Sequence, residues 1–217
     1  WIEAEDRMAV DEVLRGGMIA RGERVQVFEQ SVANFLGTRG GLACASGTAA
    51  LYLALKTLGI GPGDEVVLPT YVCWNVLAAV TASGAAPCLC DVDESGVLTV
   101  QTVRAGLSVK TRAILAVHIF GHPCDIESLL QLGLPVIEDF CQAFGLEIKG
   151  RKAGTIGTMG ITSFHATKCL TTGEGGMLIS SEPSLLARAR VFSKSADESN
   201  VFSLAVMTDL QAALGLT

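Results

Sequence analysis

Hydrophobic positions near the N-terminus repeat at the spacing of a helix. Residues 22–36 carry apolar side chains at three- and four-residue intervals, beginning at Val25, which predicts an amphipathic helix. Residues 5–16 show the same periodicity, and Gly37 is a residue at which helices typically stop. We therefore expect an N-terminal helical segment over about residues 1–37.

From residue 40 onward, short continuous apolar runs alternate with stretches of helical period. Runs that are apolar at successive positions are typical of strands buried on both faces, and their alternation with helices predicts an α/β fold with a mostly parallel sheet. The predicted strands cover residues 40–45, 65–68, 87–92, 113–117 and 134–139. The predicted helices cover residues 49–58, 73–83, 99–107 and 125–132.

The pattern changes again after residue 150, where seven glycines fall within 27 residues. Residues 159–164 and 177–180 predict short strands with turns between them, and residues 183–194 predict a helix. No repeat or low-complexity tract divides the sequence, so we expect residues 1–217 to form a single domain.

Composition and charge exclude two classes of protein. Of the 217 residues, 49% are hydrophobic and 18% are charged, which favours a compact domain with a sizeable core. The net charge is −6 with no basic run, so we expect no nucleic-acid surface, because phosphate binding needs clustered Lys and Arg. Residues 66–90 carry no charge, but Pro69 and Gly84 interrupt them, so we expect no membrane span.

Cysteine usage indicates the cellular compartment. The sequence has no C-x-x-C pair, so we expect no zinc site. An odd number of thiols, most of them in apolar runs, favours buried free cysteines in a reducing cytoplasm. We see no signal peptide, and the start at Trp1 rather than Met makes us expect a piece of something longer. The cysteines are Cys44, Cys73, Cys88, Cys90, Cys124, Cys141 and Cys169.

Ligands of parallel α/β sheets bind beyond the carboxyl ends of the strands, which directs attention to the polar residues there. At the first of these ends, a strand turns into a helix through Ser46 and Thr48. The free N–H groups of a helix start form an anion site, although an ordinary N-cap explains the same residues. The polar strand ends are Ser46–Thr48, Pro69–Tyr71, His118 and Glu138–Asp139.

Two further segments carry reactive side chains. Glu138 and Asp139 end an apolar strand, where a carboxylate could bind a metal or pair with a protonated pyridine nitrogen, or simply be a solvated strand end or a helix cap. Lys168 follows an apolar strand with no acidic residue nearby in sequence. Desolvation there would favour the neutral, nucleophilic amine, although most lysines lie at the surface.

These segments occur in a fixed order with several others. The motifs are Ser46–Leu51, Gly61–Val66, Val136–Asp139 with Gln142, Ser163–Lys168, Gly173–Gly176 and Gln211–Gly215. Together they closely resemble the DegT/DnrJ/StrS family of nucleotide-sugar aminotransferases, which depend on pyridoxal 5′-phosphate. The resemblance covers nearly the whole chain from about Val25.

The resemblance implies a fold and a set of residue roles. The fold would be a three-layer α/β/α sandwich around a mostly parallel mixed sheet, the large domain of a fold-type-I transferase. Lys168 would bond to the cofactor aldehyde and then move a proton between cofactor and substrate carbons. Asp139 would keep the pyridine nitrogen protonated, and Gln142 would lie near the ring oxygen. The phosphate would be bound by Gly47, Thr48 and Ser163.

The resemblance also implies an activity. An amino group, expected from glutamate, would pass to the keto group of a nucleotide-linked sugar in two alternating half-reactions. The segments Phe164–His165 and Thr172–Gly176 look most like those of enzymes that aminate a 4-keto sugar. Some relatives carry histidine in place of the lysine and act as dehydratases, which Lys168 argues against. Family members are usually dimers, so we expect a homodimer.

The sequence departs from the family pattern in three places. The position that usually stacks an aromatic ring on the cofactor is Cys73, and Trp74 follows it, so either a thiol or the displaced indole covers the ring. Ser203–Met207 lacks the usual Asn and Arg. The chain ends at Thr217, so we expect the family's smaller C-terminal domain to be absent.

Three hypotheses follow for function. The first is a nucleotide-sugar aminotransferase, and the second is another fold-type-I transferase or lyase with the same cofactor. The third is a degenerate homologue without catalysis, since fold alone does not determine function. The third is favoured by Ser203–Met207 and opposed by the joint presence of Lys168, Asp139 and Gln142.

Overall fold

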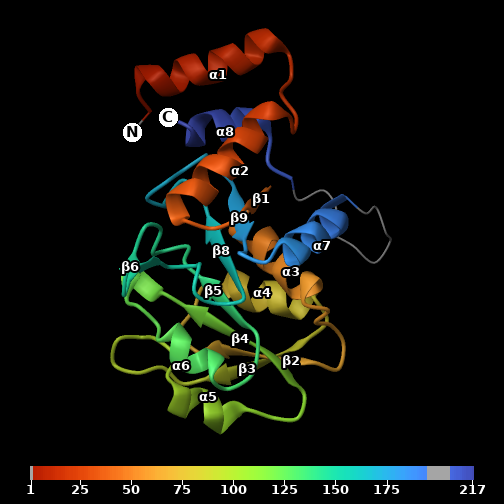
Figure 1. The fold of residues 1–217 in the computed structure, drawn as a ribbon, viewed down its shortest axis with the longest axis vertical. Helices are drawn as coiled ribbons and strands as arrows, with labels where there is room; N and C mark the ends of the chain where they lie inside the picture. The colour runs from red at the N-terminus through yellow and green to blue at the C-terminus, as the bar shows by residue number, and fades with distance from the viewer. Residues whose placement is uncertain (1, 195–205) are drawn as a thin grey trace.

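The computed structural model describes residues 2–194 and 206–217. The predicted N-terminal helices are confirmed as α1 (Ala4–Gly16) and α2 (Glu23–Leu36). Gly37 ends α2 with a φ of 72°, a left-handed conformation that glycine adopts without steric cost. Figure 1 shows α1 at one end of the molecule, away from the sheet and beside α8 (Asp209–Gly215).

Seven strands of the described chain form one sheet in the order β1-β9-β8-β5-β4-β2-β3. All pairs are parallel except those that β9 makes with β1 and β8, so the predicted mostly parallel mixed sheet is confirmed. The strands are β1 (Gly41–Cys44), β2 (Glu65–Pro69), β3 (Ala86–Cys90), β4 (Thr111–Val117), β5 (Val136–Asp139), β8 (Met159–Ser163) and β9 (Gly176–Ile179).

Helices cover both faces of the sheet, which confirms the predicted three layers (Figure 1). The connections β1–α3–β2 and β2–α4–β3 step one way along the sheet, and β3–α5–β4 and β4–α6–β5 step back. Right-handed crossovers therefore place α3 and α4 on one face and α5 and α6 on the other. The helices are α3 (Gly47–Thr57), α4 (Trp74–Ala82), α5 (Val100–Gly106), α6 (Ile126–Leu130) and α7 (Pro183–Lys194).

Four elements are absent from the sequence-based expectations. The strands β6 (Glu147–Ile148) and β7 (Arg151–Lys152) form a small hairpin that is too short to show a period. Its two turn residues, Lys149 and Gly150, both have positive φ, as in a type I′ turn. The other two are α8 and the short 3₁₀ turn η1 (Ile119–Gly121).

The end of the described chain is tied to its beginning. The buried carboxylate of Asp209 accepts hydrogen bonds from the backbone N–H groups of Gly22, Arg24 and Val25, and so caps α2 from another element. Thr208 caps α8 in turn, with Gln211 completing a capping box. None of the helices in residues 2–194 and 206–217 is a candidate membrane span.

Candidate active site

A cavity of about 300 Å³ opens at the carboxyl edge of the sheet, where the strand-end rule predicts a ligand. Segments that follow five different strands contribute to its wall: β1, β2, β4, β5 and β8. Every residue with a predicted role in cofactor binding lines this cavity: Gly47, Thr48, Asp139, Gln142, Ser163 and Lys168.

One end of the cavity is rich in hydrogen-bond donors. Ser46 is the N-cap of α3, because its hydroxyl accepts from the N–H of Ala49, so the alternative of an ordinary cap is also correct. Gly47 and Thr48 lie in the first turn, where N–H groups have no carbonyl partner inside the helix. The hydroxyl oxygen of Ser163 accepts from the N–H of His165, which leaves the Ser163 proton free to donate. This set of donors suits a phosphate group.

Two glycines allow the backbone to close around this end. A Cβ on Gly47 would lie 2.9 Å from the Cβ of Ser163 and 3.3 Å from the Cys141 sulfur, closer than ordinary contacts. A Cβ on Gly176 would collide with the backbone of Ser46. The absence of side chains at both positions therefore brings the start of α3 against the end of β8 and the start of β9.

Asp139 forms a buried acidic wall of the cavity. Its carboxylate accepts from the N–H of Cys141 at 3.0 Å, and only a small part of the residue is exposed. Burial raises the pKa of the Asp139 carboxyl, while the hydrogen bonds from Cys141 and the charge of Lys168 oppose that rise. The alternative of a solvated strand end is therefore wrong, and the geometry suits a carboxylate that faces a cation.

Lys168 reaches the same cavity from the loop after β8. The backbone N–H of Lys168 donates to the carbonyl of His165 at 2.9 Å, which forms a tight turn. The side chain is half-buried, so its desolvation is less complete than the apolar sequence context suggested. Among the described residues, no carboxylate forms an ion pair with its ammonium group, so the amine is available to a ligand.

Gln142 is held by the loop that follows β4. Its side-chain oxygen accepts from the N–H of Phe120 at 2.9 Å, which leaves its amide N–H groups as donors. Phe120 has a φ of 50°, a strained conformation for a residue with a side chain. Such strain is common beside ligand sites, and here it occurs in the loop that places Ile119 in the cavity wall.

The positions of Cys73 and Trp74 decide which of them replaces the family's stacking aromatic residue. Cys73 lines the cavity, whereas Trp74 does not and is 73% exposed. The thiol, not the displaced indole, therefore lies at this part of the wall. The other departure, the loss of Asn and Arg before Met207, concerns residues that mostly lie outside the described part of the chain.

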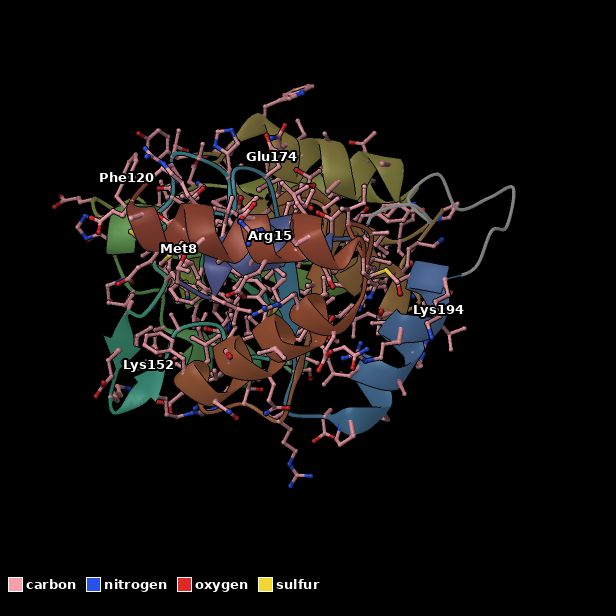
Figure 2. All side chains as sticks on the ribbon, turned by 90° about the horizontal axis from the view of Figure 1, so that it is seen from above. Met8, Arg15, Phe120, Lys152, Glu174 and Lys194 are labelled. Atoms are coloured by element: carbon pink, nitrogen blue, oxygen red, sulfur yellow. The ribbon has the colours of Figure 1, made fainter. Side chains whose placement is uncertain are left out.

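A histidine–carboxylate pair at the mouth of the cavity was present in the motifs but had no predicted role. His165 accepts from the N–H of Thr167 at Nδ1, so its Nε2 carries the proton and faces Glu174 Oε1 at 3.6 Å. Both side chains are largely exposed. Seen from above (Figure 2), Glu174 and Phe120 lie on the same side of the molecule, away from Lys152.

The cysteines are all free, but their burial is mixed. Cys44 and Cys124 are buried, and burial raises the pKa of each thiol to about 12. Cys73 and Cys169 are exposed, so the expectation of buried thiols is wrong for these two. No group of three or more potential metal ligands occurs in the described residues.

The family model described as DegT/DnrJ/EryC1/StrS aminotransferase matches residues 1–217. The chain belongs to this family. The predicted resemblance is thereby confirmed, and so are the transferase fold and pyridoxal phosphate as the cofactor of the DegT/DnrJ/EryC1/StrS enzymes.

Individual relatives agree with this assignment. The chain is 39% identical to spore coat polysaccharide biosynthesis protein SpsC of Bacillus subtilis (strain 168) over 198 residues, which cover 88% of this chain and 51% of that protein. It is 36% identical to GDP-perosamine synthase of Vibrio cholerae over 185 residues, which cover 82% of this chain and 50% of that protein. It therefore spans about half the length of the curated relatives it matches.

Solved structures show the same fold. The aminotransferase from Psychrobacter cryohalolentis matches with a TM-score of 0.93 and 32% identity, over 100% of this chain and 61% of that one. The PLP-form of Spr1654 from Streptococcus pneumoniae matches with a TM-score of 0.90 and 27% identity, over 100% of this chain and 64% of that one. The cavity thus lies in the domain that these enzymes share with this chain.

Proposed function

We propose that this chain is the cofactor-binding domain of an aminotransferase that transfers an amino group, from glutamate, to the keto group of a nucleotide-linked sugar. The observation that carries the proposal is the convergence of Gly47–Thr48, Asp139, Gln142, Ser163 and Lys168 on one cavity. Names of relatives that include a GDP-sugar synthase and a polysaccharide biosynthesis protein support the substrate class.

Each residue has a part in this proposal. Gly47, Thr48 and Ser163 bind the phosphate through N–H and O–H donors. When bound, pyridoxal phosphate carries the amino group and accepts electrons from the reacting carbon. Asp139 holds a proton on the ring nitrogen, and Lys168 holds the aldehyde and then moves a proton at the reacting carbon.

The proposal extends to assembly and location. Tyr71, Trp74 and Phe120 expose aromatic surface beside the cavity, and the rings of Tyr71 and Phe120 lie 6.2 Å apart. Exposed apolar surface of this kind favours a partner, so we place a second copy of the chain there, as a homodimer. Seven free thiols support a reducing, cytoplasmic location. Light scattering that gives the mass of one chain would contradict the dimer.

An absorbance experiment separates the three functional hypotheses. The full chain is mixed with pyridoxal phosphate, its visible spectrum is recorded, and glutamate is then added. An aminotransferase shows a protein-bound cofactor band that glutamate converts to the pyridoxamine form, and a 4-keto nucleotide sugar restores it. A bound band that no amino donor changes would favour a non-catalytic homologue or another reaction, and no bound band would contradict the proposal.

A further inference from the structure

Glu138 precedes Asp139 in the sequence but has a different environment. Successive residues of a strand point to opposite faces of the sheet, and Glu138 does not line the cavity. Its side chain is 0% exposed. A fully buried carboxylate is rare without partners, so its hydrogen bonds indicate what it is for.

Four donors surround the Glu138 carboxylate. Oε2 accepts from the Gly154 N–H at 2.9 Å and lies 3.0 Å from Nε2 of His118. Oε1 accepts from the N–H of Ile156 at 2.6 Å and from that of Gly157. Each oxygen therefore has two partners, so the buried carboxylate is fully hydrogen-bonded.

The partner histidine is fixed in the same way. His118 is also 0% exposed, and its Nδ1 accepts from the N–H of Cys124 at 3.1 Å. Nδ1 is therefore unprotonated, and Nε2 carries the proton that it donates to Glu138. The backbone N–H of His118 also donates to the carbonyl of Asp139 at 2.9 Å.

The loop around the carboxylate needs its glycines. Gly154 has a φ of 89°, and a Cβ there would collide with the Phe140 ring. A Cβ on Gly157 would lie 2.7 Å from the carbonyl oxygen of Val136 and 3.2 Å from Cγ of Glu138. The loop can thus wrap the carboxylate only because these positions lack side chains.

We infer that Glu138 and His118 are a positioning pair that fixes the Asp139 carboxylate and the Ile119 wall of the cavity, and thereby sets cofactor affinity and the protonation of its ring nitrogen. The inference rests on the proposed function. Glu138 holds the end of β5 from the face opposite Asp139, and His118 holds the start of the loop that carries Ile119.

Glu138→Gln tests the pair, because a glutamine amide must turn N–H groups toward donors that already point at this site. Asp209→Asn is a matched control: it is another buried carboxylate that accepts three backbone N–H bonds, and it does not line the cavity. Pyridoxal phosphate is titrated into each full-length variant, and the pH dependence of the bound spectrum is recorded below the melting temperature.

We expect Glu138→Gln to bind pyridoxal phosphate at least about tenfold more weakly than the wild type and to shift that pH dependence. Asp209→Asn should keep the wild-type affinity and the wild-type pH dependence, even if it unfolds at a lower temperature. His118→Asn is the milder variant, because its oxygen can still accept from Cys124 but its amide cannot reach Glu138. This variant should also bind pyridoxal phosphate more weakly than the wild type, but the loss should be smaller than in Glu138→Gln.

Three results would overturn the inference. In the first, Glu138→Gln is folded and matches the wild type in affinity and spectrum. In the second, Asp209→Asn loses affinity equally, which would assign the effect to general instability. In the third, Glu138→Gln does not fold and His118→Asn binds like the wild type. A wild-type chain that binds no pyridoxal phosphate would instead contradict the proposed function, and the inference with it.

Discussion

Gly47 and Ser163 lie side by side at the donor-rich end of the cavity, so closely that a Cβ on Gly47 would lie 2.9 Å from the Cβ of Ser163. The contact joins the start of α3 to the end of β8, two segments far apart in the sequence. It also places N–H and O–H donors from both segments at one point, where the proposal puts the cofactor phosphate.

Gly47→Ala should therefore weaken pyridoxal phosphate binding by about tenfold or more, because the added methyl group displaces Ser163 or Cys141. Gly16→Ala is the control, since a Cβ there meets nothing within 4 Å. Both affinities can be measured by titration with absorbance detection. Equal affinities for the two variants would show that the contact between Gly47 and Ser163 is not part of the phosphate site.

Asp139→Asn should separate stability from function. Burial raises the pKa of this carboxyl above its ordinary value of 3.8, so the folded protein holds the proton more tightly than the unfolded chain. The resulting stabilisation is present below pH 3.8 and is lost as the pH rises through the raised pKa. Above that raised pKa, the buried charge lowers the free energy of unfolding.

The neutral variant should consequently melt at a higher temperature than the wild type when both are free of cofactor at neutral pH, and the gain should vanish in acid. A gain of 1 kcal/mol corresponds to about 2–4 °C for a domain of this size. Its cofactor-dependent turnover should nevertheless fall sharply. Calorimetry at several pH values is the measurement, and a variant that is less stable at neutral pH would contradict the burial argument.

Cofactor binding should protect one cysteine and not another. Cys73 and Cys169 are both exposed, but only Cys73 lines the cavity. Alkylation with and without pyridoxal phosphate, read by peptide mass spectrometry, should show slower labelling of Cys73 and an unchanged rate at Cys169. Cys44 and Cys124 should stay unlabelled both with and without the cofactor, because burial raises the pKa of both thiols to about 12. If pyridoxal phosphate does not slow the labelling of Cys73, this residue does not line the cofactor site.

The sequence predicted most of the fold because most strands of the main sheet contain a short apolar run, such as Val66–Leu68 and Ala113–Val117. The short hairpin of β6 and β7 was not predicted, because a strand of two residues cannot show a period. Helix α8 was not predicted for another reason: its residues Gln211–Gly215 were interpreted only as part of a family resemblance.

The site was predictable only in part. Strand-end residues such as Gly47 and Asp139 follow from the α/β rule and from the family motifs. The difference between Glu138 and its neighbour Asp139 does not, because it depends on which face of β5 each side chain takes and on the loop that wraps Glu138. The same limit applies to Cys73 and Trp74, whose positions depend on where α4 begins.

Lys168 is the residue that we propose holds the cofactor aldehyde. Borohydride reduction of the full chain loaded with pyridoxal phosphate fixes the cofactor to whichever lysine holds it, and peptide mass spectrometry then locates it. We predict the phosphopyridoxyl mass on the peptide that contains Lys168, and its loss in Lys168→Ala. A label on Lys149 or another exposed lysine, or no label at all, would contradict this role for Lys168.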